Sequence, residues 1–143
     1  MGARCGEILK YLTLPKKKRL TSNRQFKAVL DRGRRAGDRR LTLYMAPNDC
    51  EYARLGVSVG RSSGNAVVRN RLKRLLRETF RCNQDRIPAG FDYLLMIAPA
   101  VSRRLKRPDK RANALAELTF ERMQASFLSL VEAASRRPPR KRD

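Results

Sequence analysis

The clearest hydrophobic pattern in the chain runs from Asn65 to Arg81, after a glycine-rich loop at 60–64 that we expect to be flexible. Placed on a helix at about 100° per residue, its apolar side chains gather in one arc and its cationic side chains in the opposite arc. This pattern predicts an amphipathic helix with one buried face, N-capped by Asn65. The predicted buried arc consists of Val68, Leu72, Leu75, Leu76 and Phe80.

Two further helices are predicted, one on each side of this segment. Ser22 followed by Gln25 forms a capping box and predicts a helix over 23–32. Residues 112–134 form a long amphipathic pattern whose apolar stripe we expect in the core. Residues 102–108 are predicted to be a basic loop leading into that helix.

Three segments have strand patterns. Residues 40–46 and 54–59 alternate apolar and polar side chains, and we expect two adjacent strands sharing an open face of small or polar residues with one aromatic, Tyr44. Residues 93–98 form a continuous apolar run, which is typical of a strand covered on both faces, and Pro99 is expected to end it.

The predicted order is a helix, two or three strands, a helix, a strand and a helix. We therefore expect an α+β fold, an αβββαβα sandwich with a central, mostly antiparallel sheet. We expect a single domain over 14–134. Residues 1–13 form an N-terminal extension that the pattern does not assign, and residues 135–143 are expected to be a basic disordered tail.

The charge of the chain points to a polyanionic partner. In 143 residues, 34 are Lys or Arg and 13 are Asp or Glu, a formal net charge of +21, and 41% are hydrophobic, enough for a core. No apolar run approaches the roughly 20 residues that span a bilayer, and the central helix keeps its apolar residues on one core-sized arc. We therefore expect a nucleic-acid partner, no membrane and no small-molecule substrate.

The residues that usually carry catalysis or metal binding are sparse. The chain has no His, and Cys5, Cys50 and Cys82 are widely spaced, so we expect reduced thiols in a cytoplasmic protein. The acidic residues are scattered, and the nearest pair, Asp49 and Glu51, lies in a predicted turn. We expect no catalytic residue, no metal site and no cofactor bound by this chain alone.

The run from Gly64 to Phe80, GNAVVRNRLKRLLRETF, resembles the signature of the bacterial ribonuclease P protein family, in which an RNR run opens the central helix. The resemblance covers about residues 14–133. It implies a left-handed crossover between the strands that flank the central helix, whereas generic rules favour a right-handed one. It also implies that the central helix and the loop before it face a large catalytic RNA. The residues concerned are Arg61 in the loop and Arg69, Asn70, Arg71, Lys73, Arg74 and Arg77 in the helix.

The same resemblance implies a second site, a cleft between the first helix and the sheet that holds the single-stranded 5′ leader of precursor tRNA. The positions that match it are Phe26, Leu30, Tyr44 and Ser58. Core packing is the alternative role for Phe26, Leu30 and Tyr44. An aromatic side chain there can stack on any base, which suits a leader of variable sequence.

Three positions depart from the family pattern. Leu30 stands where relatives often carry a second aromatic, and Gly60, Arg61 and Ser62 replace a frequent Lys pair. Pro99 stands where a basic residue often follows the last strand.

Taken as a whole, the resemblance implies a protein subunit of ribonuclease P, with ribonuclease P RNA and precursor tRNA as partners. Magnesium would then enter through the RNA, which would carry out the hydrolysis. The charge and size also allow a non-catalytic RNA-binding protein of the ribosomal type. A DNA-compacting protein is less favoured, because no dimer or groove-reading motif is evident.

Overall fold

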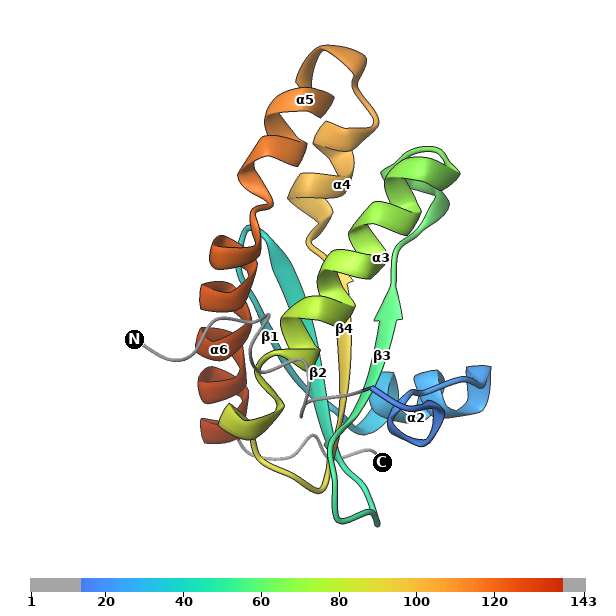
Figure 1. Ribbon diagram of the computed structural model, residues 1–143, viewed down its shortest axis with the longest axis vertical. Helices are drawn as coiled ribbons and strands as arrows, with labels where there is room; N and C mark the ends of the chain where they lie inside the picture. Colours follow the sequence, from blue (N-terminus) through green and yellow to red (C-terminus); the bar gives the residue numbers. More distant parts are fainter. Residues whose placement is uncertain (1–13, 138–143) are drawn as a thin grey trace.

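A four-stranded sheet forms the centre of the computed structural model, which describes residues 14–137 (Figure 1). Its strand order is β1-β2-β4-β3; β1 with β2 and β2 with β4 are antiparallel, and β3 with β4 is parallel. The predicted extension 1–13 and tail residues 138–143 lie outside the described range. The strands are β1 (Arg34–Gly37), β2 (Leu41–Pro47), β3 (Arg54–Ser58) and β4 (Phe91–Ile97).

Helices cover the two faces of the sheet unequally. Apolar side chains of α3 and α6 pack with Leu43 and Leu95 on one face, whereas α2 packs with Leu94 on the other. The α-helices are α2 (Asn23–Arg32), α3 (Ala66–Arg81), α4 (Pro99–Leu105), α5 (Pro108–Glu117) and α6 (Phe120–Arg136). The short 3-10 turns are η1 (Lys16–Lys18), η2 (Arg61–Ser63) and η3 (Gln84–Arg86).

The β3-α3-β4 connection is left-handed. In Figure 1, β3 and β4 both run upward, α3 lies in front of them, and β4 lies to the left of β3. This agrees with the family resemblance and departs from the usual right-handed rule. The α+β class and the mostly antiparallel sheet are confirmed.

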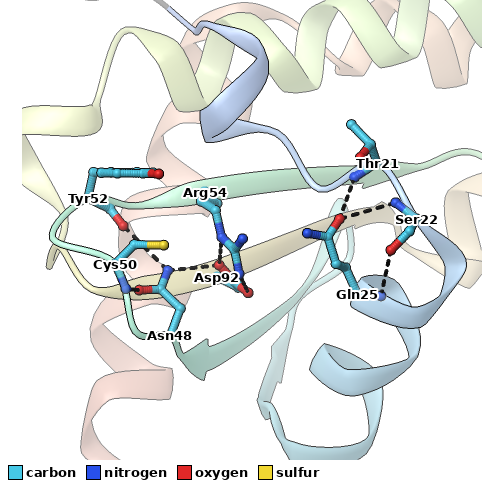
Figure 2. A network of polar contacts seen from close by, with 8 residues as sticks. All are labelled: Thr21, Ser22, Gln25, Asn48, Cys50, Tyr52, Arg54 and Asp92. Carbon is cyan, nitrogen blue, oxygen red and sulfur yellow. Dashed lines mark hydrogen bonds and ion pairs between the residues drawn. The ribbon is translucent and has the colours of Figure 1, made fainter.

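Local sequence signals position the two helices that matter most for function. At α2, Ser22 accepts from the Gln25 amide at 3.2 Å while the Gln25 side chain accepts from the Ser22 amide at 3.1 Å (Figure 2). At α3, Asn65 Oδ1 accepts from the Val68 amide at 3.0 Å. Gly64 precedes this cap with φ +132°, a backbone conformation that residues other than glycine rarely adopt. Both predicted caps are confirmed.

An aromatic cluster holds α3 and α6 against the sheet. The Phe80, Tyr93 and Phe127 rings lie with centroids 5.8 to 6.3 Å apart, and all three side chains are buried. The Tyr93 hydroxyl donates to the Pro88 carbonyl at 2.7 Å. Burial raises the pKa of Tyr93 well above its ordinary value.

The C-terminal third differs from the sequence prediction. The strand ends before Pro99, as predicted. The predicted basic loop 102–108 is nevertheless largely helical, because Pro99 also begins α4, and proline suits the first turn of a helix. The predicted single helix 112–134 is broken between α5 and α6, where Thr119 caps the start of α6. Helix α6 also continues to Arg136, past the predicted start of the tail.

The sheet differs in two respects. Strands β2 and β3, predicted to be adjacent, are separated by β4, because the parallel crossover inserts β4 between them. The loop at 60–64 contains the 3-10 turn η2, whose Ser63 is buried and lies 3.3 Å from Ser102, Oγ to Oγ.

The thiol prediction is wrong at one position. Cys50 is a free thiol, whereas Cys82 is disulfide-bonded, and Cys5 lies outside the described residues. Within 14–137, no helix has the length and apolar character needed to cross a membrane.

Candidate RNA interface

The outer side of α3 carries the strongest concentration of predicted RNA-binding residues. Leu72, Leu76 and Phe80 are buried in the core, which turns the opposite side of the helix outward. The exposed side carries Asn70, Arg71, Arg74 and Arg77. Guanidinium groups of this kind match phosphate oxygens in geometry as well as charge.

The predicted exposed arc of α3 is wrong at its margin. Arg69 and Lys73 are half-buried, because Arg69 lies one turn from Leu72 and the two cations flank the buried stripe rather than oppose it. The Nε of Arg69 is buried and has no hydrogen-bond partner within the described residues. The exposed cations of α3 are therefore those nearer the centre of its outer side.

One flank of α3 faces the edge strand β3. There the chain before α2 runs beside β3, and the Leu20 amide donates to the Leu55 carbonyl at 2.8 Å. This brings Arg19 to a hollow of about 400 Å³ that Arg74 and Arg77 also line. Sequence reasoning assigned Arg19 to neither RNA site, and only the pairing of residues 19–20 with β3 places it beside α3.

Helix α4 and turn η2 continue the positive surface beyond the start of α3. Arg61, in η2, is exposed as expected for an RNA contact, and the Ser63 to Ser102 contact holds η2 against α4. Arg103, on α4, is exposed as well. Because 102–108 was predicted to be a loop, its alignment beside α3 could not be recognised from the sequence.

The predicted leader residues come from the opposite face of the sheet. Tyr44 and Ser58 lie on the face that α2 partly covers, and both are half-buried. Met96 on β4 lies between their strands, paired directly with Ser58, and it is half-buried too. Sequence reasoning missed Met96, because it sits in a continuous apolar run in which neither face stands out.

Helix α2 borders the sheet face that carries Tyr44, Ser58 and Met96. Phe26 packs so closely on β3 that a Cβ added at Gly56 would lie 2.7 Å from its ring, so only glycine fits beneath it. Leu30 lies one turn further along α2 and is 38% exposed. Tyr44, Ser58 and Phe26 thus share one side of the sheet, with Leu30 at its more exposed margin.

The two predicted sites meet at the edge of β3. Phe26 and Arg77 line the same hollow of about 220 Å³, together with Arg19 and Val57. Phe26 belongs to the predicted leader cleft and Arg77 to the predicted face for the catalytic RNA. A single continuous surface therefore passes from the aromatic wall of α2 to the arginines of α3.

Acidic side chains are engaged in holding the scaffold. Asp92 binds Arg54, and Glu117 binds Arg104 at 2.6 and 3.1 Å. This pairing lowers the pKa of Glu117. Among residues 14–137, no group of three or more His, Cys, Asp or Glu side chains is placed to hold a metal ion.

Comparison with known proteins identifies relatives of this arrangement. The family model for Ribonuclease P matches residues 14–134. The ribonuclease P protein component of Brevibacillus brevis is 42% identical over 117 residues, which cover 81% of this chain and 82% of that protein. The corresponding protein of Petrotoga mobilis is 39% identical over 97 residues, 68% of this chain and 82% of its own.

Solved structures show the same fold. The RNase P protein from Thermotoga maritima has a TM-score of 0.65 at 30% identity, covering 80% of this chain and 96% of that chain. A Staphylococcus aureus RNase P protein mutant with defective mRNA degradation activity has a TM-score of 0.65 at 26% identity, covering 84% and 90%.

Proposed function

The chain belongs to the ribonuclease P protein family, and we propose that it promotes maturation of the tRNA 5′ end by holding two RNAs against one continuous surface. As the protein component of ribonuclease P, it is a subunit of an endoribonuclease whose catalysis is RNA-based. Its partner is therefore ribonuclease P RNA, and the ribosomal-type alternative is not favoured.

Within this function, we assign the outer side of α3 to the catalytic RNA. The exposed residues Arg71, Arg74 and Arg77 would neutralise phosphates, with Asn70 donating from its amide. Arg61 on η2 extends the contact, and Arg69 and Lys73 contribute from the half-buried margin. Each neutralised phosphate makes affinity more sensitive to salt.

The 5′ leader of precursor tRNA is assigned to the sheet face beneath α2. Tyr44 offers a ring for stacking, Ser58 a hydroxyl, and Met96 an apolar floor between their strands. Phe26 and Leu30 form the wall from α2. The observation that carries this assignment is the hollow shared by Phe26 and Arg77, because it lets one RNA pass directly beside the other.

The protein then acts by binding rather than by chemistry of its own. We propose that magnesium enters the holoenzyme through the RNA and that this chain holds no cofactor. By neutralising phosphates near the substrate, the protein would lower the magnesium demand of the reaction and favour precursor over mature tRNA. We place this activity in the cytoplasm.

Cleavage of precursor tRNA at low magnesium tests this function. The reaction is run with the protein alone, the cognate catalytic RNA alone and both together, and cleavage at the mature 5′ end is expected only with both. Precursors with a long and a single-nucleotide leader separate leader binding from general attraction. If the protein adds nothing to an RNA that is active at high magnesium, the proposed function is wrong.

A further inference from the structure

A second groove lies between α3 and the junction of α5 with α6. Figure 1 shows this junction on the side of α3 away from β3. It has a volume of about 590 Å³, within the range of small-ligand sites. The RNA assignments above use two arginines at its rim but none of its apolar walls. Its walls are mainly apolar and its rim is basic. The lining includes Leu75, Leu115, Leu118 and Phe120 as walls and Arg71 and Arg74 at the rim.

The break between α5 and α6 creates this groove. The Leu118 amide donates to the Leu115 carbonyl at 3.1 Å, and Thr119 then caps α6 by accepting from the Arg122 amide at 3.3 Å. A continuous helix would carry Phe120 onward along the axis of α5. The two hydrogen bonds between Arg104 and Glu117 tie the end of α5 to α4, so the α5 side of the groove is held before any ligand binds.

Phe120 brings an aromatic side chain to the lining of the groove. Phe120 is half-buried and makes no ring contact with another aromatic residue in the part of the chain that the structure describes. Leu75 and Leu115 are half-buried on the two sides of the groove. A flat, apolar ligand group can therefore lie against Phe120 with aliphatic contacts on its edges.

The rim selects an anionic ligand. Arg71 and Arg74 are exposed, and Glu78, the acidic residue of the lining, is paired with Arg81. A flat apolar group joined to negative charges on both sides describes a nucleotide within an RNA strand. RNA-binding proteins commonly take up such unstacked bases, which stack on aromatic or guanidinium planes.

We propose that this groove receives an unpaired nucleobase of ribonuclease P RNA, stacked on Phe120, while Arg71 and Arg74 bind the adjoining phosphates. This inference rests on the proposed function, because it concerns the same RNA on the same helix. It adds a contact with a base to a surface that otherwise binds the RNA through phosphates. The bound base would also fix the register of the RNA along α3.

Filling the groove tests the inference without disturbing the core. Ala116 lines the groove and is exposed, so Ala116→Phe blocks the base, and Ala125→Phe at an exposed site of α6 is the matched control. Phe120→Leu and Phe120→Tyr separate stacking from mere bulk. Each full-length variant is titrated with the catalytic RNA over a range of salt, and the bases of the complex are probed with reagents that modify unpaired bases.

We expect Ala116→Phe and Phe120→Leu to weaken RNA binding by about tenfold. The dependence on salt should be unchanged, and the base or adjacent bases protected by the wild-type protein should become reactive. Phe120→Tyr and Ala125→Phe should bind as the wild type does. Thermal unfolding shows whether each variant is folded. If Phe120→Leu does not fold, the result for Ala116→Phe tests the inference.

Binding of Ala116→Phe within twofold of wild type, with the same protection, would overturn the inference and leave the proposed function intact. The inference would also be overturned if Ala116→Phe changed the oligomeric state of the protein and left RNA binding unchanged, since the groove would then hold a second copy of the chain. If the wild-type protein itself does not bind the catalytic RNA in preference to other RNAs, the proposed function is wrong. That result differs from the one that overturns the groove inference alone.

Discussion

Asp92 accepts two hydrogen bonds from the guanidinium of Arg54, at 2.7 Å from Nε and 2.8 Å from Nη2 (Figure 2). The two residues are direct partners in the parallel pair β3 and β4. Asn48, after β2, donates to the same carboxylate at 2.8 Å. Hydrogen bonding with Asp92 raises the pKa of Arg54. This network joins three strands at the end where the unusual crossover brings β3 beside β4.

Asp92→Asn should therefore destabilise the protein by about 2 to 4 kcal/mol, because it leaves the partly buried guanidinium of Arg54 without its counter-charge. Urea unfolding measures the change. The exposed Asp109, 3.6 Å from Arg107, provides the control, and Asp109→Asn should change the free energy of unfolding by less than about 0.5 kcal/mol. Equal effects of the two substitutions would contradict a structural role for the Asp92 network.

Replacing Arg71 and Arg74 together by Ala should weaken binding to the catalytic RNA and reduce the slope of log affinity against log salt by roughly one to two. Both side chains are exposed, so thermal unfolding should be unchanged. Arg86 in η3 and Arg136 in α6 are also exposed but lie outside α3, and their double Ala variant removes the same charge. If the control variant loses as much affinity, the attraction depends on total charge and the assignment of the α3 face is wrong.

Tyr44→Ala should weaken binding of precursor tRNA to the holoenzyme by about tenfold, because one base loses its stacking partner. Mature tRNA and the catalytic RNA should bind as before, and Tyr44→Phe should restore precursor binding. Competition binding with precursor and mature tRNA measures the difference. Unfolding of the Ala variant, or equal losses for both tRNAs, would favour core packing as the role of Tyr44.

The stability of the fold should decline at alkaline pH through Tyr93. Its folded-state pKa is raised by burial, so the folded state keeps the proton while the unfolded chain releases it above its ordinary pKa of about 10. The contribution is therefore complete below about pH 10 and is lost as pH rises further.

Tyr93→Phe tests this pH dependence. At pH 8 the variant should be less stable by about 1 kcal/mol, since it lacks the hydrogen bond to Pro88. The difference should shrink above about pH 10 in urea unfolding measurements. Ionisation of Tyr93 in the folded protein near pH 10, seen as tyrosinate absorbance, would show that the side chain is not shielded as the structure indicates.

Short-range signals in the sequence are sufficient for the helices at the functional surface. The capping box at Ser22 and the cap at Asn65 place the starts of α2 and α3 where the structure has them, because a cap depends on residues only a few positions apart. The spacing of Leu72, Leu76 and Phe80 likewise determines which side of α3 turns outward. The family resemblance, carried by this same helix, supplied the expected function.

Tertiary structure decided which of these surfaces meet. The insertion of β4 between β2 and β3 brings Met96 to the leader face, and the pairing of residues 19–20 with β3 brings Arg19 beside Arg77. The break before Phe120 creates the groove beside Arg71. Strand order, edge pairing and the turn between packed helices depend on contacts between residues distant in the chain. Periodicity reports only which side of an element is apolar, so it predicted the helices and strands around the functional surface but not their neighbours or the break before α6.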